Sequence, residues 1–313
     1  MNSSGPTRAL STFQSQGPPW MNGVELLDDA LRNKRFLPTG CEGLDTLLGG
    51  GLRQGHLTEL VGPSASGKTQ ICLYVASYVA VKHFGSIVFF DTSNSFSPNR
   101  VASMINQICE PVHKEVFFET FLTVLFIFKI PTHAQRQERW IMKIMNSIHC
   151  QSVFDIFSLH DALHELESTL MKKTISEDKK ICMLIVDSVS SLITPILGSK
   201  DSQGHSLMVS SGYLLKKLAH EWNLAILVIN HMVSGERGTT KPAMGESWKC
   251  IPHVRLQLSR SPGSRICSIS LLRHTSMVSR SEFIPFFDCF ITLILGYFRY
   301  LIALQNTIQR FLF

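Results

Sequence analysis

The segment Gly62–Thr69, with the sequence GPSASGKT, matches the phosphate-binding pattern G-x-x-x-x-G-K-[ST]. Its two glycines allow a tight turn that directs backbone N–H groups toward phosphate oxygens. Lys68 supplies a positive charge for the β- and γ-phosphates, and the Thr69 hydroxyl suits a magnesium ion. An apolar run leads into the segment and a helical pattern leads out of it, as this chemistry requires. The segment therefore predicts a site for a nucleoside triphosphate with Mg²⁺.

Three polar residues that follow apolar runs extend this chemistry. Asp187 follows the run ICMLIV and fits the acid that holds Mg²⁺ opposite a phosphate loop. Asp91 either orients an attacking water or caps its strand, and the sequence leaves both interpretations open. His231, beside Asn230, is either a structural residue or a sensor of the γ-phosphate. We expect all three to lie near the phosphate loop.

The runs that precede these residues read as buried β-strands. Each is short, apolar and closed by a polar residue: Leu57–Val61, Ile87–Phe90, Ile181–Val186 and Leu224–Ile229. Segments of helical spacing separate them: Ile71–Val81, Phe157–Thr169 and Leu207–Glu221. This alternation predicts an α/β fold with a parallel sheet that is covered on both faces. Ligands of such sheets bind at the carboxyl ends of the strands, which brings the polar residues and the phosphate loop to one edge.

Two polar segments follow the third and fourth of these strands, Thr194–Ser206 and Val233–Glu246. We expect both to be loops on the nucleotide side of the sheet. The second segment carries Arg237 and Lys241. The loops therefore either contact nucleic-acid phosphates or are ordinary solvated loops.

The composition fits a globular intracellular protein. The 313 residues, 44% of them hydrophobic, suffice for one large α/β domain with small additions. A net charge of +6 permits a polyanionic partner, but the basic residues are scattered rather than gathered into a track. The eight cysteines include no C-x-x-C pair and the chain opens without a secretory signal, so a reducing compartment is expected and a zinc site is not.

The chain is expected to comprise a disordered arm at 1–22, a globular core at 23–279 and an atypical apolar tail at 280–313. An apolar insertion at 117–135 interrupts the core, and its greasy run of 14 residues is too short for a membrane span. Pro285, Asp288 and Arg299 break up the apolar tail, so no membrane association is expected.

Five motifs are spread over most of the chain: TGCEGLDTLLGGG (Thr39–Gly51), GKTQIC (Gly67–Cys72), VFDIF (Val153–Phe157), LIVDS (Leu184–Ser188) and KPAMGESW (Lys241–Trp248). Together they resemble the RecA-type strand-exchange recombinases of eukaryotes, and within that family the D-type paralogues of plants. The resemblance covers residues 20–116 and 136–278. It implies a RecA-like P-loop ATPase core, with a mainly parallel central sheet flanked by helices.

The resemblance also implies a role and a set of site residues. Such paralogues act in homologous-recombination repair as hetero-oligomers that assist the main recombinase on single-stranded DNA, which places this chain in the nucleus. The residues that correspond to the ATP site are Gly62, Pro63, Ser64, Ala65, Ser66, Gly67, Lys68, Thr69 and Gln70, together with Arg100 at the adenine and His231. Thr69 and Asp187 correspond to the metal site, Lys68 and Asp91 are the candidate catalytic residues, and 194–206 and 233–246 correspond to DNA-facing loops.

The sequence departs from the family pattern in several places. Ser93 stands where the strand-exchange enzymes carry their catalytic glutamate, so weak ATP hydrolysis at most is predicted. The family's small N-terminal helical domain is missing, and the insertion and the tail have no counterpart. We hypothesise that these differences belong to a variant gene model or splice form. The leading function is an ATP-binding DNA-repair subunit with weak DNA-dependent ATPase activity; the alternative is a nucleotide-gated adaptor without turnover.

Overall fold

The computed structural model describes residues 22–32, 36–109, 133–172, 180–197, 203–235, 239–260, 267–275 and 284–286. The chain divides into two compact units between Arg35 and Phe36. In the first unit, helix α1 (Gly23–Arg32) begins after Asn22, whose Oδ1 accepts the N–H groups of Val24 and Glu25, each at 3.0 Å. The Glu25 carboxylate in turn accepts the Asn22 N–H at 2.9 Å. This reciprocal pair is a capping box that fixes the start of the helix.

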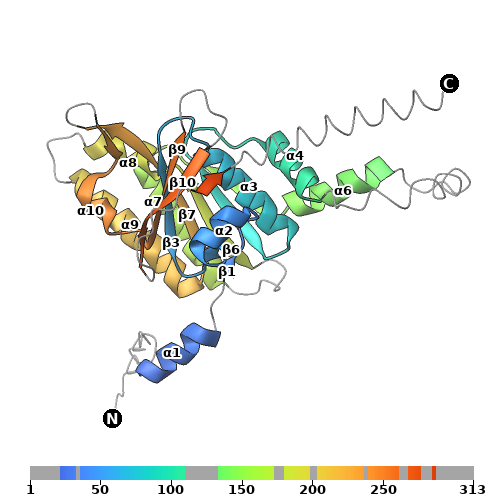
Figure 1. The fold of residues 1–313 in the computed structure, drawn as a ribbon, viewed down its shortest axis with the longest axis horizontal. Coiled ribbons are helices and arrows are strands. Elements are labelled where there is room, and N and C mark those ends of the chain that lie inside the picture. Colours follow the sequence, from blue (N-terminus) through green and yellow to red (C-terminus); the bar gives the residue numbers. More distant parts are fainter. Residues whose placement is uncertain are drawn as a thin grey trace, which may run out of the picture. The chain divides into compact units, whose positions relative to one another are not determined.

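The second unit is built on one mixed β-sheet (Figure 1). Its described strands follow the order β11-β10-β9-β3-β7-β6-β4-β5, and β8 pairs with β7 outside this path. The strands are β3 (Leu57–Gly62), β4 (Ser86–Asp91), β5 (Ile148–Ser152), β6 (Ile181–Asp187), β7 (Ala225–Ser234), β8 (Thr240–Pro242), β9 (Val254–Arg260), β10 (Cys267–His274) and β11 (Ile284–Phe286). Neighbours from β9 to β5 are parallel, whereas β10 and β11 add antiparallel strands at one edge. The predicted α/β fold with a mainly parallel sheet is confirmed.

Helices cover both faces of this sheet and bury a separate apolar core on each (Figure 1). The first face carries α3 (Lys68–Val81), α4 (Pro98–Cys109) and α6 (His133–Met145), and the second carries α7 (Ile156–Met171), α8 (Val189–Leu197), α9 (Gln203–Trp222) and α10 (Gly245–Lys249). Strand β4 shows why its sequence is an uninterrupted apolar run. Ile87 and Phe89 belong to the first core and Val88 and Phe90 to the second, since successive side chains of a strand alternate between faces.

The glycine-rich lead-in to β3 forms a small addition to this unit. Strands β1 (Phe36–Leu37) and β2 (Leu52–Arg53) pair antiparallel, and α2 (Glu42–Leu48) lies between them in sequence. Helix α2 ends at Gly49, which has a left-handed φ of 72°. At Gly51, with φ of 120°, a Cβ atom would lie 2.3 Å from the carbonyl oxygen of Leu37. Glycine is required there because the chain returns in close contact with β1.

The segments expected to be loops contain regular structure. Helix α8 extends to Leu197 with Pro195 inside it, and α9 begins at Gln203, so only 198–202 of the first segment lies outside the described helices. In the second segment β7 continues to Ser234, pairs antiparallel with β8, and is followed by α10. The prediction of two plain loops is therefore wrong where these helices and strands lie, at 194–197, 203–206, 233–234, 240–242 and 245–246. The tertiary pairing of β7 with β8 overrides the polar sequence that suggested a loop.

Several predicted regions fall on residues that the structure does not describe. The arm lies outside the described residues up to residue 21, and so do 110–132, with most of the apolar insertion, and the tail apart from 284–286. Residues 133–135 of the predicted insertion belong to α6, and Ile284–Phe286 of the predicted tail form β11, which pairs with β10. Within the described part of the chain, no helix has the length and apolar character to cross a membrane.

Candidate nucleotide-binding site

The phosphate-binding pattern lies between the end of β3 and the start of α3, as the sequence predicts. Two of its residues have left-handed backbones, Ala65 with φ of 58° and Gly67 with φ of 94°. The Ser66 N–H donates to the Pro63 carbonyl at 3.3 Å and closes the turn. The first N–H groups of a helix have no partner within the helix, so the N-terminal end of α3 presents them toward the concave side of this loop.

Gly62 begins the loop where there is no room for a side chain. A Cβ atom at this position would lie 2.7 Å from the carbonyl oxygen of Leu258 and 2.7 Å from Ser66 Oγ. The Leu258 oxygen belongs to the backbone of the neighbouring strand β9 and cannot move without distorting the sheet. Glycine is thus required by close packing at this end of the motif.

Lys68 is buried in the loop, where its Nζ donates to the carbonyl oxygens of Gly62 at 2.8 Å and Pro63 at 2.7 Å. Burial lowers the pKa of this ammonium group, and the nearby Asp187 carboxylate opposes that effect. The group is therefore held inside the loop by two carbonyl oxygens. Phosphate oxygens could accept the same N–H groups and would also compensate the buried charge.

Asp187 ends β6 beside the loop, with its carboxylate against the first turn of α3. Burial raises its pKa, while hydrogen bonds from the Thr69 and Ser95 hydroxyls and the charge of Lys68 oppose this. The Ser95 Oγ lies 3.3 Å from Asp187 Oδ2. A carboxylate in contact with the threonine hydroxyl of a phosphate loop provides the oxygen donors that Mg²⁺ prefers.

Two buried polar atoms around the loop test whether a phosphate group fits. Ser66 Oγ and Gln70 Oε1 are buried without a hydrogen-bond partner among the described residues. Unsatisfied polar atoms are rare in protein interiors, and a bound ligand is one of their explanations. Ser66 Oγ and the Lys68 ammonium can donate to phosphate oxygens, whereas Gln70 Oε1 can only accept and, with the Thr69–Asp187 contact, suits a hydrated divalent cation.

Asp91 ends β4 next to Asp187 in the register of the sheet and is buried. Its Oδ1 accepts the N–H groups of Ser93 at 3.1 Å and Ser95 at 3.0 Å, and its Oδ2 accepts the Phe96 N–H at 2.9 Å. The carboxylate therefore caps the segment that follows the strand, which is one of the two roles that the sequence left open. Ser93 is exposed at the turn of this segment and presents a hydroxyl in place of a carboxylate.

His231 lies beside the loop, but it does not end its strand as predicted. Strand β7 continues past it to Ser234, and His231 pairs in register with Gly62. Its Nε2 lies 2.9 Å from Ser188 Oγ, and its backbone N–H donates to Ser190 Oγ at 2.9 Å. Partial desolvation, and then the charge of Lys68, lowers the pKa of the imidazole. A neutral ring near the Lys68 ammonium is compatible with both interpretations from the sequence, a structural role and γ-phosphate sensing.

A hydroxyl network that the sequence did not indicate joins β4 to the residues after β6. Thr92 Oγ1 accepts the Ser188 N–H at 2.6 Å and shares a hydrogen bond with Ser191 Oγ at 2.7 Å. The Ser191 hydroxyl also reaches the Ser188 carbonyl at 2.7 Å. No local pattern marks these residues, because their partners are nearly a hundred positions apart in sequence. The network fixes the backbone that follows Asp187.

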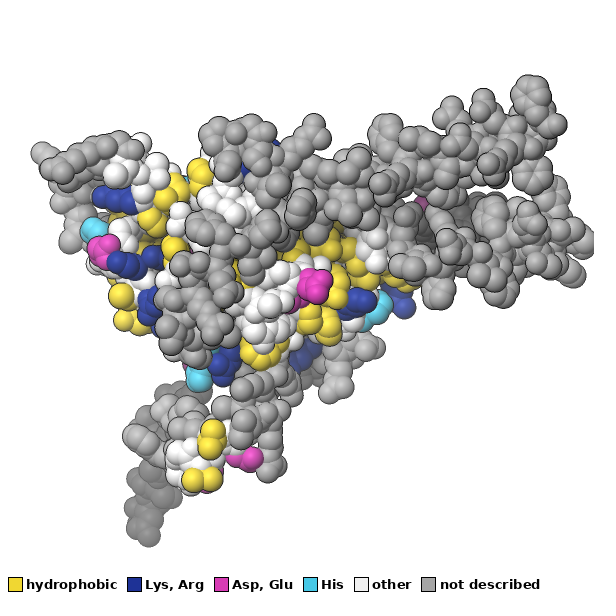
Figure 2. Space-filling model, in the orientation of Figure 1, with side chains coloured by type: hydrophobic (Ala, Val, Ile, Leu, Met, Phe, Trp, Pro, Cys, Tyr) yellow, Lys and Arg dark blue, Asp and Glu magenta, His cyan; other side chains and the backbone are white. Residues whose placement is uncertain are grey.

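The other predicted site residues are placed as follows. Pro63, Ser64 and Ala65 are exposed, and Arg100 is exposed in the first turn of α4. Lys241 is exposed on β8, whereas Arg237 lies outside the described residues. On the face shown in Figure 2, lysine and arginine side chains are dispersed among other residue types, in agreement with their scattered sequence positions.

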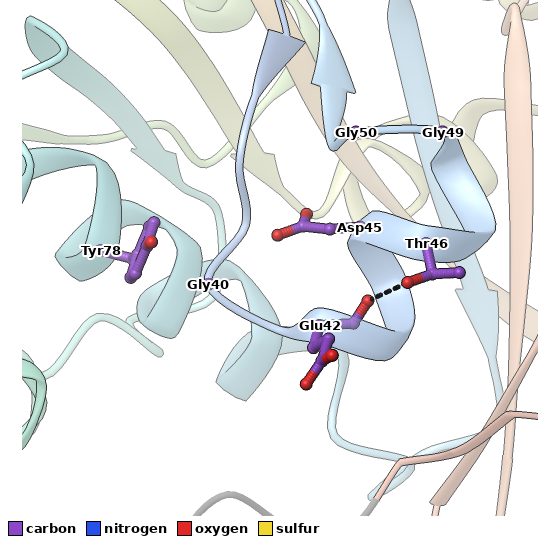
Figure 3. Close-up of a pocket in the computed structure, with 7 residues that line it drawn as sticks. All are labelled: Gly40, Glu42, Asp45, Thr46, Gly49, Gly50 and Tyr78. Atoms are coloured by element: carbon purple, nitrogen blue, oxygen red, sulfur yellow. Dashed lines mark hydrogen bonds between the residues drawn. The ribbon is translucent and has the colours of Figure 1, made fainter.

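A separate pocket of about 440 Å³ lies over α2 and α3 and is shown in Figure 3. It is lined by Gly40, Glu42, Asp45, Thr46, Gly49, Gly50 and Tyr78. Its polar groups serve the local fold, since Asp45 Oδ1 accepts the Thr39 N–H at 2.8 Å and hydroxyl at 2.7 Å, and Thr46 Oγ1 donates to the Glu42 carbonyl at 2.8 Å. All but Tyr78 belong to the glycine-rich lead-in motif. The packing of α2 thus explains the lead-in motif, and the phosphate loop remains the candidate functional site.

Comparison with known proteins agrees with this geometry. The family model described as Rad51 matches residues 32–116. The chain is 31% identical over 244 residues to "DNA repair protein RAD51 homolog 4" of Bos taurus, covering 78% of this chain and 67% of the relative. It is 30% identical over 249 residues to "Probable DNA repair protein RAD51 homolog 4" of Dictyostelium discoideum, covering 76% and 70%. It is also 28% identical to "DNA repair and recombination protein RadB" of Thermococcus sibiricus over 239 residues, covering 74% and 84%. With a phosphate loop at the carboxyl edge of a mainly parallel sheet and relatives of this kind, the chain belongs to the Rad51 family of RecA-type recombinases and, within it, to the recombinase paralogues.

Proposed function

We propose that this chain is an ATP-binding DNA-repair protein of homologous recombination, a paralogue subunit that assists a strand-exchange recombinase on single-stranded DNA. The observation that carries the proposal is the contact between Thr69 and Asp187 beside the buried ammonium of Lys68. A loop that only closed a fold would not need a buried lysine, a hydroxyl and a carboxylate to converge. The names of the relatives, which are DNA repair proteins, supply the cellular process.

In this proposal the loop backbone from Gly62 to Gly67 and the N-terminal end of α3 bind the phosphates of ATP. Lys68 exchanges its carbonyl partners for phosphate oxygens, and Thr69 with Asp187 forms the environment of Mg²⁺. The bound ion would neutralise the charge of the triphosphate. Arg100 and His231 are proposed to contact the adenine and the γ-phosphate.

Turnover is proposed to be weak, because the residues after β4 supply no carboxylate for a water molecule. The Asp91 oxygens accept backbone N–H groups, and Ser93 carries a hydroxyl. Positioning or deprotonating the attacking water needs a carboxylate or an amide within hydrogen-bond reach of it, and the Asp91 carboxylate is buried and held in its cap. The same observation favours a second candidate function, in which ATP orders an interface for a partner and no hydrolysis follows.

The partners are proposed to be other recombinase paralogues, and β5 offers them a surface. Among the described strands β5 lies at the sheet edge, with its last four residues exposed. A pocket of about 1240 Å³ adjoins it, with lining residues that include Val88, Ile144, Cys150, Ala162 and Leu166. An edge that pairs with no further described strand, beside a pocket lined by both apolar and polar side chains, suits an added strand with one anchoring side chain. Single-stranded DNA is proposed to contact the carboxyl edge of the sheet near β8. Because DNA repair takes place in the nucleus, a nuclear location is proposed as well.

Co-purification tests the proposal directly. The chain is mixed with candidate paralogues with and without ATP and Mg²⁺, and the wild type is compared with Lys68→Ala and with Lys180→Ala, which removes an exposed lysine at the start of β6. We expect assembly that depends on ATP, is lost in Lys68→Ala and is retained in Lys180→Ala. Assembly that is equal in all three chains, or the same without ATP, would refute nucleotide gating.

Phosphate release separates the two candidate functions. Release stimulated by single-stranded DNA, above the level of Lys68→Ala, supports the weak ATPase. ATP-dependent assembly with release no higher than in Lys68→Ala supports the adaptor.

A further inference from the structure

The amino-terminal edge of the sheet, at the opposite end of β3 from the phosphate loop, carries basic side chains that the proposed function does not use. They come from β2, from the turns that lead into β3 and β9, from α9 and from the end of β10, which pairs antiparallel with the start of β9. We call them the basic cluster: Arg53, His56, Lys216, His253, Arg273 and His274.

The turn that leads into β3 fixes two members of this cluster. The His56 N–H donates to the Arg53 carbonyl at 3.3 Å. The turn is tied to the amino end of β7, because the Gly55 N–H donates to the Leu224 carbonyl and the Ile226 N–H donates to the His56 carbonyl, each at 3.0 Å. Arg53 and His56 therefore have defined positions at this edge.

The two imidazole rings of the turns into β3 and β9 are stacked and hold their protons on the same nitrogen. The rings of His56 and His253 have centroids 4.5 Å apart and planes 21° apart. The Leu57 N–H donates to His253 Nδ1 at 2.9 Å, so the proton of the neutral His253 ring is on Nε2. His56 Nδ1 is buried without a partner among the described residues, and because a buried orphan N–H is rarer than a buried orphan acceptor, this ring also carries its proton on Nε2.

Both Nε2–H groups can meet a ligand. Neither atom is fully buried, and neither has a hydrogen-bond partner in the part of the chain that the structure describes. The stack therefore presents two neutral N–H donors side by side at the surface of the basic cluster.

The surroundings of the two rings are positive. Burial, followed by His253 and Arg53, lowers the pKa of His56 to about 3. Burial, followed by Lys216 and Arg273, lowers the pKa of His253 to about 4. The smaller contributions are also from basic groups: His274 and Lys216 at His56, and Arg53 and His220 at His253. Both rings are thus neutral at pH 7, and the charge of the cluster comes from its arginines and its lysine.

That charge has no counter-charge among the described side chains. The Arg53 guanidinium and the Lys216 ammonium have neither a hydrogen bond nor an ion pair there. Arg273 Nη1 donates to the Lys249 carbonyl at 2.6 Å, which is a neutral partner. Like charges at one edge repel one another, and a bound anion would remove this repulsion.

The carboxylates on the same elements are engaged elsewhere. Those carried by β2, β3, α9, β9 and β10 are Glu59 and Glu221. Glu221 lies 3.9 Å from the Lys217 ammonium. Glu59 is the centre of a buried cluster in which it accepts hydrogen bonds from three side chains, Asn230 Nδ2 at 2.7 Å, Trp248 Nε1 at 2.8 Å and Arg255 Nε. Neither is available to the basic cluster.

We infer that the basic cluster binds the phosphate group of a small ligand, held by the Arg53 guanidinium, the Lys216 ammonium and the Nε2–H groups of the stacked rings. The planar fork of an arginine matches the oxygens of a phosphate, and a lysine adds a point charge. The cluster is confined to one edge and does not form a track, so it suits one phosphate group better than a nucleic-acid strand. This inference does not rest on nucleotide binding, because the phosphate loop lies at the other end of β3.

Nuclear magnetic resonance of the histidine rings tests the site, with sulfate as the probe. Sulfate keeps its charge between pH 7 and pH 6, and chloride in the reference sample keeps the ionic strength equal. The ring signals are assigned by their loss in His56→Gln and His253→Asn. We expect a saturable shift of both rings with sulfate; no shift beyond that caused by chloride overturns the inference. Sulfate in the phosphate loop does not contribute to these signals.

Charge-removing variants identify the groups that hold the anion. Lys216→Gln and Arg53→Gln should each raise the dissociation constant for sulfate at least fivefold, because each removes a charge-assisted hydrogen bond. Lys143→Gln, at an exposed position of α6, makes the same change in net charge and should bind sulfate as wild type does. Both test side chains are only half-buried, and either variant alone decides the question if the other does not fold. Wild-type affinity in the variant that folds overturns the inference.

The pH dependence of binding tests the neutral state of the rings. A second proton on His253 would break its bond with the Leu57 N–H, and one on His56 would be a buried donor without an acceptor. The dissociation constant for sulfate should therefore change less than twofold between pH 7 and pH 6. Tighter binding at pH 6 by more than twofold would overturn the assignment of neutral donors.

The last comparison identifies the source of the phosphate group. Inorganic phosphate and glycerol 3-phosphate should both shift the two rings; a stronger response to the ester identifies a phosphomonoester as the ligand, and an equal or weaker one identifies the free ion. A single-stranded oligonucleotide at the same concentration of phosphate groups should leave the rings unshifted, and a shift as large as that with phosphate overturns the assignment to a small ligand. If the chain binds no ATP analogue, the proposed function fails and these ring measurements still decide the inference.

Discussion

Acidification is expected to destabilise the core through two stacked imidazoles at the amino ends of β3 and β9. The His56 and His253 rings have centroids 4.5 Å apart, and the Leu57 N–H donates to His253 Nδ1 at 2.9 Å. Burial, followed by the neighbouring positive groups, lowers the pKa of His56 to about 3. Burial, with Lys216 and Arg273 as the leading charges, lowers the pKa of His253 to about 4.

The direction and size of the effect follow from proton linkage. A histidine whose pKa is lower in the folded than in the unfolded state binds fewer protons when folded, so its contribution is complete above an unfolded pKa of about 6.5 and is lost as the pH falls toward the folded value. Between pH 6.5 and 5, each ring crosses about 1.5 units at about 1.36 kcal/mol per unit, or about 2 kcal/mol. Both rings are only partly buried, and solvent screening reduces this to about 1 kcal/mol each.

Urea unfolding at pH 7 and pH 5 measures this loss. His253→Asn keeps an acceptor for the Leu57 N–H without a titratable ring, so it should lose about 1 kcal/mol less than wild type over this range. Exposed His83→Gln serves as the matched control and should behave like wild type. A His253→Asn variant whose loss of stability equals that of wild type would refute the assignment to these rings.

Three further predictions concern the nucleotide site. Ser93→Glu places a carboxylate on an exposed turn and should raise DNA-stimulated phosphate release at least tenfold, since general base catalysis typically contributes about 10²–10⁴-fold. If phosphate release does not increase, or increases equally in Ser93→Gln, the role assigned to this position is wrong. Gly62→Ala places a Cβ 2.7 Å from the Leu258 carbonyl oxygen and should weaken nucleotide binding, measured by calorimetry, at least tenfold. The control Gly23→Ala, whose Cβ would meet nothing within 4 Å, should bind nucleotide as wild type does. Equal affinities of the two variants would show that the loop can accommodate a side chain at Gly62. Thr92→Val leaves the buried Ser188 N–H without its acceptor at 2.6 Å and should lower the free energy of unfolding by about 1–3 kcal/mol. The control Thr46→Val, on the exposed side of α2, should have a smaller effect. Equal stabilities of the two variants would contradict the structural role assigned to the Thr92 hydroxyl.

The parallel core is predictable from sequence because buried strands with both faces covered leave an uninterrupted apolar signal. Strand β4 and strand β6 show this, since their sequences contain almost no polar residue before the closing aspartate. Strand β5 has the opposite character. Its sequence IHCQS is mostly exposed at the sheet edge, so it carries no apolar run by which it could be recognised.

The extension of β7 and the cluster around Glu59 could not be predicted for a different reason. Asn230 and His231 look like residues that end a strand, and only pairing with β8 carries the strand past them. Glu59 interrupts an apolar run, and its partners Asn230 and Arg255 are 171 and 196 positions away in sequence. Long-range hydrogen bonds of this kind leave no local pattern. The phosphate loop can be recognised in the sequence because its functional residues are contiguous.

The cap formed by Asp91 has a consequence for which substitutions this turn tolerates. Its carboxylate holds the backbone of residues 93–96 through N–H groups, which every residue type except proline possesses. The side chain at position 93 is exposed and takes no part in that support. Substitution at this position should therefore cost little stability, whereas Gly62 of the phosphate loop is constrained by close packing against β9. A substitution at position 93 therefore alters the chemistry that this turn presents, whereas a substitution at Gly62 disturbs the sheet itself.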